Sequence, residues 1–98
     1  MAFHHVVLFR WQPGVTAEQI DHVTASLRAL SAGLGGCRAY ACGPGLGLSD
    51  FSSDYGVVAT FDSREAWDDY MADPEHDRIR SELILPIVAE RAGIQMEL

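Results

Sequence analysis

Tyr70 and His76 are the two residues whose types and spacing first suggest chemistry. They lie six positions apart in the stretch DYMADPEHDR, with Pro74 between them. A phenol hydroxyl donates a hydrogen bond, and an uncharged imidazole accepts a proton near neutral pH. If the fold brings both side chains to one cavity, the pair can assist proton transfer by general acid–base catalysis.

A break between two short helices is expected to bring these two side chains together. Asp73 is a favoured N-cap residue, and Pro74 then takes the first position of a second helix, where proline is also favoured. Tyr70 would lie on the last turn of the first helix and His76 on the first turn of the second. The two aromatic rings should therefore converge across the break.

His76 is expected to be uncharged at pH 7. It shares one helical face with Ile79, Leu83 and Ile87, so the imidazole should point inward. Burial and the N-terminal end of a helix both disfavour a positive charge at that place. The alternative is that His76 only holds the helix junction and that Tyr70 is a core aromatic residue.

Two strands are expected to complete the cavity. FHHVVLFRW (3–11) alternates so that His5 shares a face with Val7 and Phe9, and YGVVATF (55–61) alternates in the same way. The small side chain of Ala59 should leave room there, although His5 could also be a packing residue. We expect the binding cavity to be lined by His5, Val7, Phe9, Leu27, Tyr55, Val57, Ala59, Ile79 and Leu83, with His76 and Tyr70 as catalytic groups.

Capping pairs mark the starts of two helices. A helix over 16–36 begins with Thr16 and Gln19, and a helix over 62–72 begins with Asp62 and Glu65. Glycines close to residue 36 should end the first helix. Both helices then connect predicted strands.

The order of the predicted elements defines a fold class. Strands over 37–43 and 93–98 complete the sequence strand–helix–strand–strand–helix–strand, which is the split βαβ, ferredoxin-like order. We therefore expect one α+β domain over residues 1–98, with a four-stranded antiparallel sheet and helices on one face.

The other face of this sheet should be apolar and uncovered. Val6, Leu8 and Val58 point to that side by strand alternation. An uncovered apolar sheet face implies a partner, and pairing two such sheets would give a homodimer with a barrel-like centre. His4 points to the same side, where a role in the interface is more plausible than chemistry.

Charge and hydropathy narrow the partners. The net charge of −7 argues against a nucleic acid or an anionic membrane as partner. No apolar run reaches the roughly 20 residues of a membrane span, and nothing resembles a signal peptide, so a cytoplasmic location is expected.

Neither a metal site nor a bound cofactor is expected. His4 and His5 point to opposite sheet faces, and no Cys/His cluster has ligand spacing. Cys37 and Cys42 are also expected on opposite faces, which argues against a disulfide between them. The glycine-rich loop over 44–54 lacks the pattern of a phosphate-binding loop.

Three segments resemble the stress-responsive α/β-barrel family, often called Dabb. They are HVVLFRWQPGVT, DYGVVATFDSREAWDDYMADPEH and the closing strand, with Tyr70, Pro74 and His76 forming the pattern Y-x-x-x-P-x-H. The resemblance implies a dimeric ferredoxin-like barrel. One family member is a cofactor-free polyketide cyclase, and its catalytic tyrosine, catalytic histidine and pocket histidine match Tyr70, His76 and His5.

The resemblance implies a role for each matching residue. His76 would remove a proton next to a carbonyl, and Tyr70 would hold the carbonyl oxygen. The first helix carries Val23, Thr24 and Leu27 where the cyclase has aromatic residues, so the resemblance does not carry over the substrate.

The first hypothesis is therefore a cofactor-free acid–base catalyst acting on a small apolar or aromatic carbonyl compound, for example in aldol or Claisen ring closure. The alternatives are a dimer that binds a small molecule without catalysis, a structural role in a larger assembly, and a cofactor-independent monooxygenase-like enzyme.

Overall fold

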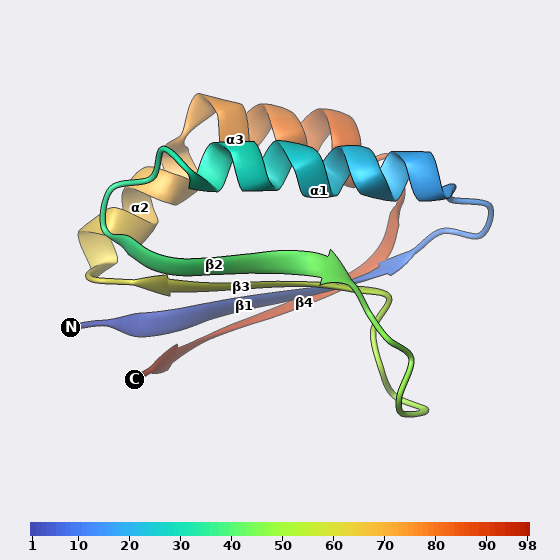
Figure 1. Ribbon diagram of the computed structural model, residues 1–98, viewed down its shortest axis with the longest axis horizontal. Coiled ribbons are helices and arrows are strands. Elements are labelled where there is room, and N and C mark those ends of the chain that lie inside the picture. Colours follow the sequence, from blue (N-terminus) through green and yellow to red (C-terminus); the bar gives the residue numbers. More distant parts are fainter.

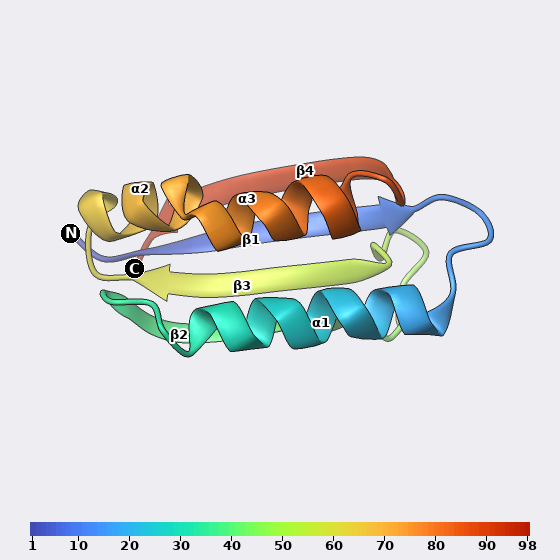
Figure 2. The ribbon, with the colours of Figure 1, turned by 90° about the horizontal axis from the view of Figure 1, so that it is seen from above.

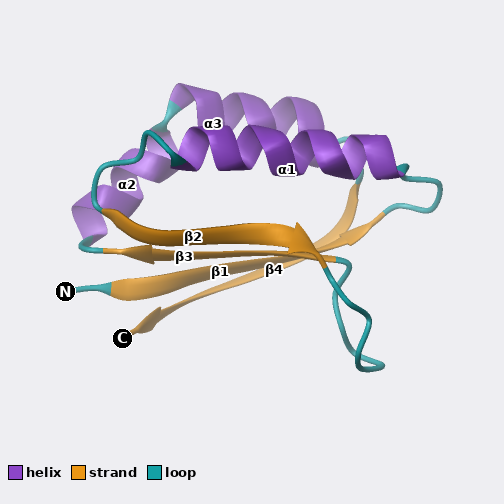
Figure 3. Ribbon diagram, viewed as in Figure 1, coloured by secondary structure: helices purple, strands orange, loops and turns teal.

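The chain folds as a four-stranded antiparallel sheet with all its helices on one face. The computed structural model describes residues 1–98, and the strand order is β2-β3-β1-β4. Figure 1 and Figure 3 show the helices as one layer above the sheet and no element on its other face. The predicted ferredoxin-like α+β fold is confirmed. The elements are β1 (Phe3–Trp11), α1 (Ala17–Ser31), β2 (Cys37–Pro44), β3 (Tyr55–Phe61), α2 (Arg64–Ala72), α3 (Pro74–Ile79), the π-helical turn η1 (Arg80–Ile84) and β4 (Val88–Glu97).

The central strands alternate as their sequences predict. β1 pairs with β3 on one side and with β4 on the other, all antiparallel. Most helix-facing side chains of β1 and β3 are buried, and the core they form with the helices falls into two adjoining clusters. The buried residues of these two strands are Phe3, His5, Phe9, Tyr55, Val57, Ala59, Thr60 and Phe61.

The start of α1 is confirmed, and its end comes earlier than predicted. The Thr16 side chain accepts the Gln19 N–H, and the Gln19 side chain accepts the Thr16 N–H, so the capping box is complete. The helix stops at Ser31, before the glycine-rich stretch 33–36. Gly36 has a φ of 73°, a left-handed conformation that glycine adopts without steric cost.

The cap predicted for α2 is wrong, and the cap predicted for α3 is confirmed. The Ser63 hydroxyl caps α2 by accepting the Ala66 N–H, whereas Asp62 pairs with Arg38. Asp73 caps α3, because its Oδ1 accepts the backbone N–H groups of the second and third helical residues.

A π-helical turn follows α3 and rotates the buried face. The Leu85 N–H donates to the Arg80 carbonyl at 2.8 Å, one residue further than in an α-helix. As a result Ile84 is buried, and Leu83 is only half buried. The continuous helical face expected to carry Leu83 and Ile87 after Ile79 is therefore interrupted at Leu83, and Ile87 is buried from a position beyond the helix. Single π-turns inside helices are frequent at functional sites.

β4 begins at Val88, five residues earlier than predicted. Most of its residues are exposed, so the strand lacks the buried alternation that identifies β1 and β3. Figure 2 shows β4 at the sheet edge, with its first half beyond α3 and outside the cover of the helices. The early start places Arg91 within the sheet, opposite Phe9 of β1, and Gly93 lies opposite Val7.

An irregularity in β2 corrects the expectation for the cysteines. The register shifts between Cys37 and Ala39, which adds one residue to this strand. Cys37 and Cys42 therefore both lie against the helix-side clusters, half buried and free.

The sheet face away from the helices is apolar and open, as predicted. It carries Leu8 and Val58, which are 41% and 44% exposed, and also Ile94 and Met96 of β4. None of the helices is both long enough and apolar enough to cross a lipid bilayer.

Candidate functional site

A cavity of about 270 Å³ lies between the sheet and the α2–α3–η1 segment. Its volume is slightly below the usual range of ligand pockets, which suits a small molecule. β1, β3 and β4 supply one wall, and α1, α2, α3 and η1 supply the other. The lining residues are His5, Val7, Phe9, Leu27, Val57, Tyr70, Met71, His76, Arg80, Ile84, Arg91, Ala92 and Gly93.

Four residues expected in the lining lie outside it. The Tyr55 hydroxyl bonds to the Thr24 hydroxyl at 2.7 Å, away from the cavity. Ala59 is buried beside Phe3, Phe61 and Tyr70. Ile79 is completely buried in the main core, and the π-turn replaces Leu83 by Ile84. All other residues expected at the site line the cavity, and their roles toward a ligand remain predictions.

Six lining residues were not expected from the sequence. Arg91 and Ala92 belong to the part of β4 that the prediction missed, and Gly93 is the first residue of the predicted strand. Arg80 and Ile84 belong to the π-turn, whose rotation has no sequence signal. Met71 of α2 lines the cavity next in sequence to Tyr70.

His76 is a buried, uncharged imidazole with one nitrogen unsatisfied. Asp73 holds its backbone N–H at 3.2 Å, and its ring stacks on Tyr70 with centroids 4.1 Å apart. Nδ1 is fully buried and has no hydrogen-bond partner. Burial, followed by repulsion from Arg80 and His5, lowers the pKa of His76 to about 4. The ring therefore stays neutral at pH 7.

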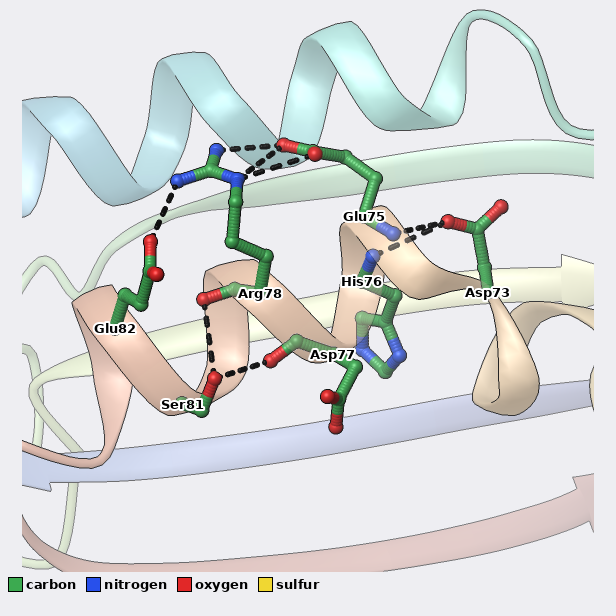
Figure 4. A network of polar contacts seen from close by, with 7 residues as sticks. All are labelled: Asp73, Glu75, His76, Asp77, Arg78, Ser81 and Glu82. Carbon is green, nitrogen blue, oxygen red and sulfur yellow. Dashed lines mark hydrogen bonds and ion pairs between the residues drawn. The ribbon is translucent and has the colours of Figure 1, made fainter.

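Figure 4 shows why the imidazole is isolated from the charged face of its helix. The carboxylates of Glu75 and Glu82 both pair with Arg78 on the solvent side, at 2.6 and 3.1 Å. The Ser81 hydroxyl donates to the Asp77 carbonyl at 2.8 Å. These groups satisfy one another, and the ring of His76 extends from the other side of the helix.

His5 is held in one tautomer by its neighbours. Trp67 Nε1 lies 3.2 Å and Gln95 Nε2 lies 2.9 Å from His5 Nδ1. An indole N–H can only donate, so Nδ1 must be the unprotonated acceptor and the proton must lie on Nε2. Burial also lowers the pKa of His5. Trp67 thus fixes His5 as a neutral ring with Nε2–H as its donor.

Tyr70 is buried, and its hydroxyl already has a partner. Its oxygen lies 3.0 Å from the hydroxyl oxygen of Tyr40, and either group can donate. Burial raises the pKa of Tyr70, so the phenol keeps its proton. When Tyr40 is the donor in this bond, the Tyr70 proton stays available as a donor toward the cavity.

The cavity has basic and apolar walls. Arg80 lines it while donating to Asp77 at 2.9 Å, and Arg91 lines it from β4. No aspartate or glutamate is among the lining residues. Nowhere in the structure do three His, Cys, Asp or Glu side chains gather closely enough to hold a metal ion.

The whole fold matches one family. The family model described as Stress responsive A/B Barrel Domain, or Dabb, matches residues 3–97. The chain belongs to this family, in agreement with the resemblance noted in its sequence. No curated protein matches the chain.

Solved structures with this fold include dimers and one enzyme. A dimeric ferredoxin-like protein of unknown function from Thermobifida fusca is 34% identical, with a TM-score of 0.92 over 100% of this chain and 92% of that chain. A dimeric ferredoxin-like protein of unknown function from Jannaschia is 20% identical, with a TM-score of 0.86 over 100% of both chains. A hydroxynitrile lyase from Passiflora edulis is 17% identical, with a TM-score of 0.84 over 99% of this chain and 93% of that chain. The dimeric neighbours support a homodimer.

Proposed function

We propose that this protein is a cofactor-free acid–base catalyst that acts on a small carbonyl compound, such as one undergoing aldol ring closure. The observation that carries the proposal is a pair of neutral histidines, His5 and His76, on one mostly apolar cavity. The two rings have complementary capacities, because His5 offers a donor and His76 can accept a proton.

The proposed reaction needs only these groups. His76 removes a proton from the carbon beside a carbonyl group through Nε2, which makes no hydrogen bond within the protein. The electron pair moves to the carbonyl oxygen. His5 Nε2–H and the Tyr70 hydroxyl then donate hydrogen bonds that stabilise the resulting enolate. The enolate carbon attacks a second carbonyl carbon, and the imidazolium returns its proton to the new alkoxide.

The energetics of His76 support a functional role. A buried polar atom without a partner destabilises a fold by about 1–3 kcal/mol. His76 Nδ1 is such an atom, and only one other buried side-chain polar atom, Trp11 Nε1, is also unsatisfied. A position that opposes stability is typical of a residue retained for activity.

A hydroxynitrile lyase has the same fold. At 17% identity it supports the fold, and the chemistry proposed here rests on the site residues.

Binding without catalysis is the second candidate. It is favoured if Tyr70 is the donor in its hydrogen bond to Tyr40, because the Tyr70 proton is then not available to hold a substrate. Under this alternative the histidines only orient a ligand. A cofactor-independent monooxygenase would use the same cavity and is distinguished by oxygen uptake.

We further propose that a second copy covers the open sheet face. The loop between β2 and β3 projects toward that side of the sheet in Figure 1. Leu46, Leu48 and Phe51 in this loop are about 85% exposed, which suits contact with an apolar partner surface.

Deuterium exchange tests the proposed catalysis without knowledge of the natural substrate. The probe is 1-phenylhexane-1,5-dione in D2O, because its two carbonyls permit both α-proton exchange and ring closure. NMR follows both processes for the wild type, for His76→Leu and for the control Arg78→Gln. General base catalysis typically contributes a factor of about 10²–10⁴.

The proposal expects exchange above the buffer rate in the wild type and in Arg78→Gln, and loss of that excess in His76→Leu. Exchange that is unchanged in His76→Leu would refute His76 as the base. Saturable binding of the probe with no exchange in any variant would favour the binding alternative.

A further inference from the structure

Arg91 differs from every other arginine in the chain. Arg10, Arg38, Arg64, Arg78 and Arg80 each pair with a carboxylate. Arg28 donates to the backbone carbonyl of Cys42. Arg91 makes no ion pair and no side-chain hydrogen bond, yet it lines the cavity. A guanidinium has five donors arranged to bind carboxylate or phosphate oxygens, and here all of them are free.

The charge of the cavity contrasts with the charge of the protein. The chain has 14 aspartates and glutamates against 7 arginines and no lysine. None of these acids lines the cavity, whereas Arg80, Arg91 and two histidines do. The cavity wall thus has cationic side chains and no carboxylates. It provides a local site for an anion, although the protein as a whole is acidic.

From these observations we propose that the ligand carries an anionic group, a carboxylate or a phosphate, bound by Arg91 with Arg80 nearby. This inference rests on the proposed function, and it narrows the substrate class to an amphipathic anion whose apolar carbonyl-bearing part enters the cavity. Because Arg91 lies on the exposed edge strand β4, the anionic group lies at the mouth of the cavity and the carbon skeleton lies deeper.

The register of β4 makes room for that skeleton. Arg91 pairs with Phe9 of β1, and Gly93 pairs with Val7, two residues further along the strand. A Cβ at Gly93 would meet only the Val6 carbonyl oxygen at 3.5 Å and a Val7 methyl at 4.0 Å, which are ordinary contacts. Neither sterics nor a positive φ requires glycine there, so its main effect is to leave open space beside Arg91.

A bound anion would also change the basicity of His76. Burial is the main cause of the low pKa of His76, repulsion from Arg80 adds to it, and Asp73 and Asp77 on the same segment oppose it. An anion close to Arg80 offsets that repulsion and raises the pKa of His76 toward the operating pH, where a general base is most effective. The substrate would thus activate its own base.

Calorimetry with matched probes tests the inference. The acidic probe is 4-oxo-4-phenylbutanoate, the neutral probe is its methyl ester, and phenacyl phosphate distinguishes phosphate from carboxylate. The variants are Arg91→Gln, which removes the free cation, and Arg78→Gln, which makes the same charge change away from the cavity. Gly93→Val fills the cavity beside Arg91 and reports whether a probe binds there.

We expect the wild type to bind at least one anionic probe at least about tenfold more tightly than the ester, since charge-assisted hydrogen bonds are roughly twice as strong as neutral ones. Arg91→Gln should remove this preference, and Arg78→Gln should retain it. Gly93→Val should weaken binding of every probe.

Equal affinity for acid, phosphate and ester, or an anion preference that survives in Arg91→Gln, would overturn the inference. If Gly93→Val still weakens binding in that case, a carbonyl compound does bind in the cavity and the proposed function stands. If Gly93→Val changes nothing, or if no probe binds, the proposed cavity function fails together with the inference.

Discussion

Replacing His76 by leucine should remove a pH-dependent weakness of the fold. The substitution keeps an apolar side chain of similar size at a buried position and eliminates the unsatisfied Nδ1. We therefore expect His76→Leu to match or exceed the wild type in free energy of unfolding at pH 8. Loss of the ring stack on Tyr70 offsets part of the gain.

The difference between the two proteins should grow as the pH falls. The pKa of His76 is about 4 in the folded protein and 6.5 when the ring is free. Between these values the unfolded chain binds more protons, so acidification favours unfolding. The linkage relation gives a loss of about 2 kcal/mol per protomer at pH 5 and about 3 kcal/mol below pH 4. His76→Leu cannot titrate at this position and should lack this loss.

Urea unfolding of both proteins between pH 8 and pH 5 measures the difference directly. Protein concentration must be fixed, because the stability of a dimer depends on it. Other titrating groups, including His5, occur in both proteins and cancel in the comparison. Parallel stability curves over this pH range would refute a depressed pKa for His76, and a large loss of stability in His76→Leu at pH 8 would show that the imidazole mainly supports the fold.

Three further changes test other parts of the structure. Trp67→Phe removes the indole N–H that donates to His5 Nδ1 and so favours the neutral ring. The pKa of His5 should therefore rise in an NMR titration; an unchanged pKa would show that Gln95 alone fixes the ring. Val58→Asp places a charge on the open sheet face and should give a monomer in sedimentation velocity, whereas an intact dimer would exclude this face as the interface. Asp73→Ala removes the cap of α3 and should lower the stability by about 0.5–2 kcal/mol, while Asp73→Asn, which retains an acceptor, should lower it less; equal losses would show that the cap contributes nothing.

Sequence periodicity predicted the parts of the fold that combine burial with regular hydrogen bonding. β1 and β3 have alternating apolar side chains, and both are observed over the predicted residues. The capping box at Thr16 and the Asp73 cap also depend on short-range contacts that a sequence specifies. These local signals were sufficient to place His5, Tyr70 and His76 around one cavity.

The remaining features depend on tertiary context. The π-turn after Ile79 and the irregularity near Cys37 each shift a face by one residue, and neither has a distinctive local sequence. The first half of β4 is exposed and carries the charged residues Glu90 and Arg91, so it resembles a loop until β1 pairs with it. Arg91 was missed for this reason, and with it the charge of the cavity.

The ring nitrogens of His5 and His76 provide the most direct test of the central claim, which is a cavity with two neutral imidazoles of complementary capacity. Nitrogen-15 correlation spectra of the free protein at pH 7 report the protonation state and tautomer of each ring. We predict that both rings are uncharged and that His5 carries its proton on Nε2. A cationic His76 at pH 7, or a His5 protonated on Nδ1, would contradict the account.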